Sequence, residues 1–201
     1  MTIRSDTHPH GGGTVLIIAP FWRHPMNVGN YRVDRFTRWL KDGGYQVVIA
    51  RAGPEDDVEQ TDAGHEITLR DPLTLYPVAE TRSTRRRKPN KVRRFLAYVV
   101  FNPDPSIVWA RRVVNHPLVK EYAGNTVCVM SSGPPDSSHI AASRLAERFG
   151  AKFIADMRDG WLDEPLKPLL RKYKFQQMRE GRLEKRILSQ ADRIVVTSEV
   201  W

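Results

Sequence analysis

The feature that most constrains the fold is an amphipathic helix between two apolar runs. Residues 15–19 (VLIIA) are continuously apolar, which is typical of a strand covered on both faces. Residues 31–41 present apolar side chains on one side of a predicted helix, which ends at Gly43 and Gly44. Residues 45–50 form a second apolar run. Strand, helix and strand with short connections predict a βαβ unit, in which the two strands pair in parallel through a right-handed crossover.

The same alternation returns in the last third of the chain. Apolar runs at 126–130, 152–155 and 193–197 predict strands, and helical spacing predicts a helix after residue 138 and another at about 170–189. The pattern is that of an α/β domain of the Rossmann-like, doubly wound type, with a mainly parallel sheet and helices on both faces. We expect residues 1–13 to be a flexible tail and residues 14–201 to form this domain.

The middle of the chain is less regular. Residues 53–64 are acidic and rich in turn formers, residues 66–69 suggest a short strand, and residues 106–121 are consistent with one continuous helix. We therefore predict a turn, a strand and a helix for these three segments.

Composition excludes several classes of protein. The single cysteine, Cys128, leaves no internal disulfide and no cysteine-based zinc site, and the six histidines lack the spacing of metal ligands. We therefore expect no metal site. The apolar runs are too short to cross a membrane, and the N-terminus has no apolar segment typical of a signal peptide. The sequence thus predicts a cytoplasmic protein.

The formal net charge of +9 comes almost entirely from one segment. Residues 82–94 hold eight basic and no acidic residues, and the rest of the chain has a net charge of +1. A half-apolar helical pattern at 92–99 follows, so this basic insert is suited either to an anionic membrane surface, at the inner face of the membrane, or to a solvated loop. Nucleic acid is a weaker candidate, because the insert has no aromatic residue for base stacking. The candidate membrane or anion patch comprises Arg85, Arg86, Arg87, Lys88, Lys91, Arg93 and Arg94.

Three loops that follow predicted strands carry candidate binding residues, since ligands of such sheets bind at the carboxyl ends of the strands. The first, residues 20–32, contains Gly29 before a helix, where backbone N–H groups can approach an anion. A plain turn between strand and helix explains this loop equally well.

The second loop, residues 131–139, offers serine hydroxyls to a phosphate or a sugar, and we expect Asp136, Ser137 or Ser138 to cap the following helix. His139 lies in the first helical turn, where it serves either a catalytic or a structural role. In the third loop, residues 156–161, two carboxylates flank a guanidinium; this group either binds a polyol or orders the loop. Trp161 fits a sugar platform or a core position.

Two of these loops match motifs of a known family. Residues 132–139 fit the pattern Ser-x-Pro-Pro-x-Ser-x-His, residues 156–161 fit Asp-x-Arg-Asp-x-Trp, and residues 191–199 fit Ala-Asp-x-Val/Ile followed by Ser-Glu. Residues 14–51 fit the opening strand, loop, helix and strand of the same family. In these motifs and their order, the chain resembles the N-terminal domain of family 4 glycosyltransferases, which have two Rossmann-like domains (the GT-B fold).

The resemblance implies a role for each matching residue. Gly29 and Asn30 would face the sugar donor, although Asn30 stands where the family usually has a second glycine. The residues implied to bind the acceptor are Ser132, Ser137, Asp156 and Arg158, and the implied catalytic candidates are His139 and Asp159. Transfer in the family is metal-independent and needs no cofactor besides the nucleotide-sugar, which is the donor substrate.

The sequence also departs from the complete family pattern. It contains no pair of glutamates in an E-x7-E motif, which belongs to the family's donor-binding domain. We therefore expect an acceptor-side half with little activity alone, which needs a donor-binding domain or subunit and takes a sugar or lipid-linked acceptor. The alternative is a non-catalytic module that binds a carbohydrate or a partner.

Overall fold

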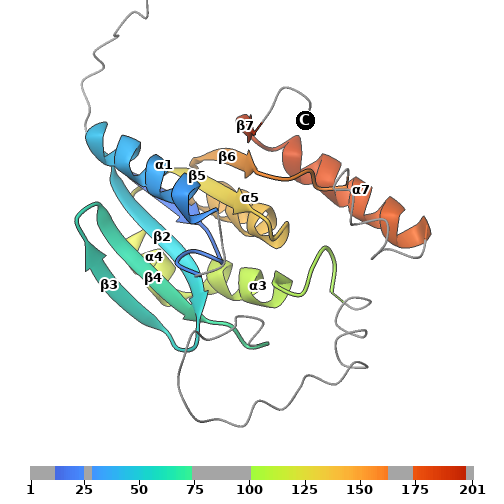
Figure 1. Ribbon diagram of the computed structural model, residues 1–201, viewed down its shortest axis with the longest axis horizontal. Coiled ribbons are helices and arrows are strands. Elements are labelled where there is room, and N and C mark those ends of the chain that lie inside the picture. Colours follow the sequence, from blue (N-terminus) through green and yellow to red (C-terminus); the bar gives the residue numbers. More distant parts are fainter. Residues whose placement is uncertain (1–11, 25–28, 74–100, 163–173, 198–201) are drawn as a thin grey trace, which may run out of the picture.

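The computed structural model describes residues 12–24, 29–73, 101–162 and 174–197, and within them seven strands form one sheet (Figure 1). The order across the sheet is β3-β4-β2-β1-β5-β6-β7, from the left edge of Figure 1 to the upper right. The strands are β1 (Thr14–Ile18), β2 (Gln46–Gly53), β3 (Asp57–Thr61), β4 (Gly64–Arg70), β5 (Thr126–Gly133), β6 (Lys152–Met157) and β7 (Arg193–Val196).

All neighbouring strands pair in parallel except β3, which is antiparallel to β4. Without β3, the strands follow the order of a dinucleotide-binding sheet. From β1 the chain adds strands first toward β4 and then, from β5, toward β7, so the strand order reverses between β1 and β5. The loops after these two strands leave the sheet in opposite directions, so they frame the place where such sheets bind ligands. The Rossmann-like α/β fold predicted from the sequence is confirmed.

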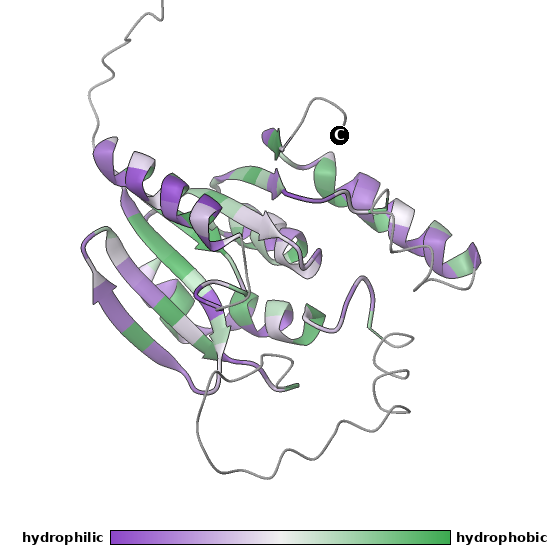
Figure 2. Cartoon of the chain, viewed as in Figure 1, coloured by the Kyte–Doolittle hydropathy of each residue, from purple (hydrophilic) through white to green (hydrophobic). Residues whose placement is uncertain are grey.

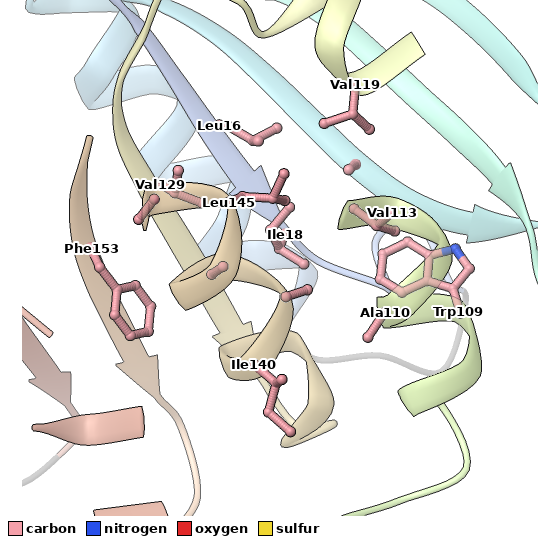
Figure 3. Close-up of a cluster of buried hydrophobic side chains, with 14 of the residues drawn as sticks. Leu16, Ile18, Trp109, Ala110, Val113, Val119, Val129, Ile140, Leu145 and Phe153 are labelled. Carbon is pink, nitrogen blue, oxygen red and sulfur yellow. The ribbon is translucent and has the colours of Figure 1, made fainter. Parts of the chain in front are cut away.

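Helices cover both faces of the sheet. On one face, Val33 of α1 (Asn30–Asp42) packs on Val15, Ile17 and Val47. The opposite face carries α3 (Ile107–Asn115), α4 (Pro117–Tyr122), α5 (Ser137–Phe149) and α7 (Lys174–Leu188). Figure 3 shows part of that larger core, in which side chains of β1, β5 and β6 meet those of α3, α4 and α5.

Two predictions for the middle of the chain are wrong. The expected helix over 106–121 is broken into α3 and α4, because Pro117 has no N–H and holds His116 in an extended conformation (φ −77°, ψ 134°). The expected turn over 53–64 contains β3, an edge strand of sequence DVEQT. The sequence of β3 is mostly polar, so it lacks the apolar pattern that predicts a strand. Polar residues suit an edge strand because charges there oppose pairing with another chain.

The other predicted elements are confirmed, with shifts of a few residues at their ends. Gly150 ends α5 in the left-handed conformation (φ 62°), as the glycine after this helix predicted. Residues 1–11, the basic insert 82–94 and residues 170–173 lie outside the described residues. No helix within the described ranges combines the length and the apolar character that crossing a membrane requires.

Cys128 lies on β5, where it packs against the smaller of the two cores, on the α1 face of the sheet. Burial and the nearby Asp192 carboxylate raise the pKa of the Cys128 thiol to about 11. At about pH 8 only about one thiol in a thousand is then ionised, so we expect very slow reaction with Ellman's reagent in the native protein. Unfolding in urea should accelerate the reaction strongly, and fast labelling of the folded chain would contradict this environment.

Candidate functional site

An ion pair between Arg32 and Asp156 crosses the carboxyl ends of the parallel strands. Asp156 is fully buried near the end of β6, and Arg32 reaches it from the first turn of α1. Arg32 Nη2 lies 2.6 Å from Asp156 Oδ1, and Arg32 Nε lies 2.7 Å and 3.0 Å from Oδ1 and Oδ2. The guanidinium therefore holds both carboxylate oxygens, and it joins the start of α1 to the end of β6 across the end of β5.

Ser132 completes the surroundings of this carboxylate. It is the register partner of Asp156 on β5, and its hydroxyl acts to lower the pKa of the Asp156 carboxyl. Burial raises the pKa of Asp156 above its ordinary value, and the hydrogen bond and charge of Arg32, together with Ser132, offset only part of that effect. Asp156 is thus a carboxylate held by the protein's own donors rather than one open to solvent.

Arg158 and Asp159 form the exposed part of the same loop. Arg158 Nε lies 3.3 Å from Asp159 Oδ2, and the Arg158 carbonyl accepts a hydrogen bond of 3.1 Å from the Thr197 hydroxyl. The side chain of Asp159 is 49% exposed, so it is the carboxylate of this loop that a solute can reach.

His139 is buried, in contrast. Its Nδ1 lies 2.7 Å from Ser131 Oγ, and its ring stacks on Trp161 with centroids 5.6 Å apart. A Cβ at Gly133 would lie 2.4 Å from His139 Nε2, so only a glycine leaves room for the ring. Trp161 is also buried, and its Nε1 donates to Glu180 Oε1 at 3.2 Å. Of the two interpretations of Trp161, the core position is therefore the one observed.

Asp104 occupies the N-terminus of α5. Its carboxylate accepts hydrogen bonds from the Ser137 N–H at 2.9 Å, the Ser137 hydroxyl at 2.8 Å and the Ser106 N–H at 2.9 Å. The expected cap from Asp136, Ser137 or Ser138 is wrong, because Asp136 at the N-cap position makes no side-chain capping bond and the Ser137 N–H donates to Asp104 instead. Asp104 lies 33 positions earlier in the chain than Ser137. It therefore supplies the negative charge that the helix dipole favours, and it links the starts of α3 and α5.

Asn30 closes the base of the loop after β1. Its Oδ1 accepts the Arg23 N–H at 3.1 Å, and its Nδ2 donates to the His24 carbonyl at 2.9 Å. Gly29, the other predicted donor-facing residue, lies at the N-cap position of α1 and is buried. The structure thus brings Asn30, Arg32, Ser132, Asp156 and their neighbours to one edge of the sheet.

The loop after β1 is also held by a buried glutamate that sequence reasoning missed. Glu66 on β4 is buried, and its carboxylate accepts the Trp22 indole N–H at 2.9 Å. It also pairs with Arg23, at 2.9 Å from Nε, and with Arg51. Arg23 adopts a left-handed conformation (φ 59°), which is uncommon for a residue with a side chain and is maintained here by these contacts. A lone glutamate in a predicted strand gives no signal for this network.

Two hollows lie elsewhere on the described part of the chain, and neither is lined by predicted site residues. One of about 300 Å³ is lined by Arg51, Thr68 and residues 54–57, and one of about 360 Å³ lies between the end of α1 and the β3–β4 hairpin. Within the described residues, no three His, Cys, Asp or Glu side chains are grouped so that they could hold a metal ion. The candidate site is therefore the polar rim at the carboxyl ends of β1, β5 and β6.

A mainly parallel sheet of this order, with helices on both faces, defines a Rossmann-like domain. The chain belongs to the glycosyl transferase 4-like domain family, whose model matches residues 29–201. The resemblance noted from the sequence motifs is thus confirmed. A comparison with curated proteins found no match.

We expect Arg32→Gln to lower the free energy of unfolding by about 3 kcal/mol at neutral pH, because it leaves a buried carboxylate without its cation. The loss should shrink toward acid pH. Without Arg32 the pKa of Asp156 rises further, so the carboxyl takes up a proton and no longer needs a cation. Urea unfolding of both proteins from about pH 5 to about pH 8 measures the difference.

The matched control is Arg35→Gln, which removes an exposed arginine from the same helix and should change stability by less than about 0.5 kcal/mol. The double variant Arg32→Gln/Asp156→Asn should recover most of the stability lost in Arg32→Gln. A double variant as unstable as Arg32→Gln would show that Arg32 acts through packing and not through charge.

Proposed function

We propose that the chain forms the acceptor-side part of a glycosyltransferase that takes its sugar from a nucleotide-sugar. The observation that carries the proposal is the grouping of Ser132, Asp156, Arg158 and Asp159 at the carboxyl edge of the sheet, in a chain of the glycosyl transferase 4-like family. Hydroxyl, carboxylate and guanidinium groups together suit the hydroxyls of a sugar.

The exposure of each site residue decides whether we propose that it contacts the substrate or supports the site. Asp159 is exposed and is the candidate to accept a proton from, or to orient, the attacking hydroxyl of the acceptor. Arg158 and Ser132 are partly exposed and are candidate acceptor ligands. Asp156, Ser137 and His139 are buried, so they act by holding Arg32 and the loops after β5 and β6 in place.

The donor requires a second component. The sequence has no E-x7-E motif, so we propose that a donor-binding domain or subunit supplies the groups that stabilise the leaving diphosphate. Gly29 and Asn30 would face that component from the start of α1. The acceptor is a sugar or a lipid-linked sugar, and the basic insert 82–94 favours an anionic membrane surface as a further partner.

A non-catalytic binding module is the second candidate. It is favoured by the burial of His139 and Asp156, two of the residues that the family resemblance assigns to the site. A module of this kind would bind carbohydrate or a partner protein at the same edge without transferring a sugar.

Sugar transfer can distinguish these two functions. The purified chain would be incubated with a panel of nucleotide-sugars and acceptors, alone and fused to the donor-binding domain of a two-domain glycosyltransferase of known donor. We expect release of nucleoside diphosphate from the fusion and none from the chain alone. Transfer by the chain alone would contradict the need for a second component, whereas saturable sugar binding without transfer in any combination would favour the module.

Two substitutions should separate chemistry from structure in an active enzyme. Asp159→Ala should lower kcat by about a hundredfold, as expected for loss of a general base. It should change stability by less than about 0.5 kcal/mol, because the Asp159 side chain is exposed and its pair with Arg158 is long, at 3.3 Å. His139→Ala should cost about 2–4 kcal/mol of stability, because it empties a buried site beside Trp161. Kinetics and urea unfolding of both variants provide the test, and an Asp159→Ala enzyme with full activity would remove Asp159 from the mechanism.

A further inference from the structure

Two large aromatic side chains remain uncovered on α1. Tyr31 is 80% exposed and Trp39 is 61% exposed, whereas Trp22, Trp109 and Trp161 are buried in the cores. The opposite side of α1 is well packed, since Val33 is buried and Phe36 and Leu40 contact the sheet. The exposure of Tyr31 and Trp39 is therefore a property of one face of this helix and not of a loosely attached helix.

Two exposed arginines lie on the same face of α1, which also has Asp34 beside it. Arg35 and Arg38 are exposed and lie four and seven positions after Tyr31, so they project from the same side of the helix as the aromatic residues. The Arg35 guanidinium lies 5.8 Å from the centre of the Trp39 ring, and no ion pair to either arginine is present within the described residues. Lys41 pairs with exposed Asp62 at 3.5 Å, and Asp42 is an acidic residue at the end of the face.

We propose that this outer face of α1, defined by Tyr31, Arg35, Arg38 and Trp39, binds an anionic lipid surface. Tyrosine and tryptophan have an apolar ring and a polar group, which suits them to the boundary between acyl chains and headgroups. Arginine pairs with lipid phosphates while its apolar stem lies along the boundary. α1 lies along the outside of the molecule in Figure 1, and in Figure 2 most of its residues are coloured as hydrophilic, as expected of a helix that lies on a membrane and does not cross it.

The position of this face relative to the candidate site has a consequence. Tyr31 is the neighbour of Arg32, which pairs with Asp156, so the lipid-binding face begins beside the polar rim at the strand ends. A membrane bound to α1 would hold a lipid-linked acceptor next to Ser132 and Asp159. This consequence rests on the proposed function, whereas the binding of α1 to lipid does not.

Co-sedimentation with vesicles tests the proposal on the full chain, with residues 82–94 unchanged in every variant. The vesicles contain phosphatidylcholine and phosphatidylglycerol in equal parts, or phosphatidylcholine alone. We expect binding to the anionic vesicles that weakens at high salt, and a loss of about tenfold or more in Tyr31→Ala/Trp39→Ala. Arg35→Gln/Arg38→Gln should lose about fivefold for each arginine removed.

Matched controls lie on α7, where Phe175 is 63% exposed and Met178 is 59% exposed. Phe175→Ala/Met178→Ala removes two exposed apolar side chains, and Arg179→Gln/Arg182→Gln removes two exposed arginines. Both controls should bind vesicles like the wild type, and anionic vesicles should shift the tryptophan fluorescence of the wild type to the blue but not that of Trp39→Ala.

Three results would overturn the proposal. The first is equal loss of binding in the α1 and α7 variants, and the second is wild-type binding by both α1 variants. The third is a change of oligomeric state in Tyr31→Ala/Trp39→Ala without a change in vesicle binding, which would assign the face to a second copy of the chain. Each result is independent of sugar transfer, so it can be distinguished from failure of the proposed function.

Discussion

The ion pair between Arg32 and Asp156 is the interaction on which the arrangement of the strand-end loops depends. A carboxylate that is removed from water costs several kcal/mol unless a cation and hydrogen bonds replace the lost solvation, and here Arg32 and Ser132 do so. Since Arg32 comes from α1 and Asp156 from β6, the pair fixes the start of the helix relative to the end of that strand. The loops after β1, β5 and β6 are thereby held around one edge of the sheet.

Other polar groups at this edge are also used within the protein. Asp104 links the starts of α3 and α5, Asn30 closes the loop after β1, and Glu66 holds that loop through Trp22 and Arg23. Buried polar groups of this kind need satisfied partners, and once satisfied they rigidify a site. The side chains left to meet a solute are then few, and exposed Asp159 is the clearest of them. In the proposed function, this rigid rim positions the acceptor.

Much of the fold could be predicted from local patterns. The apolar run of β1, the glycines after α1 and the left-handed Gly150 each reflect a requirement of one segment, so the sequence reveals them directly. The two wrong predictions have different causes, one local and one long-range. Pro117 divides a segment whose apolar spacing is otherwise helical, and β3 is a strand because β4 offers it an edge, although its own residues favour a turn.

The sequence by itself determined the α/β class, the order of most elements and the family, because these depend on periodicity and on motifs within short segments. The tertiary structure decided which polar residues are buried and which are exposed. Asp156 and Arg158 lie in one motif, yet Asp156 is buried against an arginine 124 positions away and Arg158 remains partly open to solvent. The physical reason is that desolvation and ion pairing depend on contacts between distant segments, which no local pattern encodes.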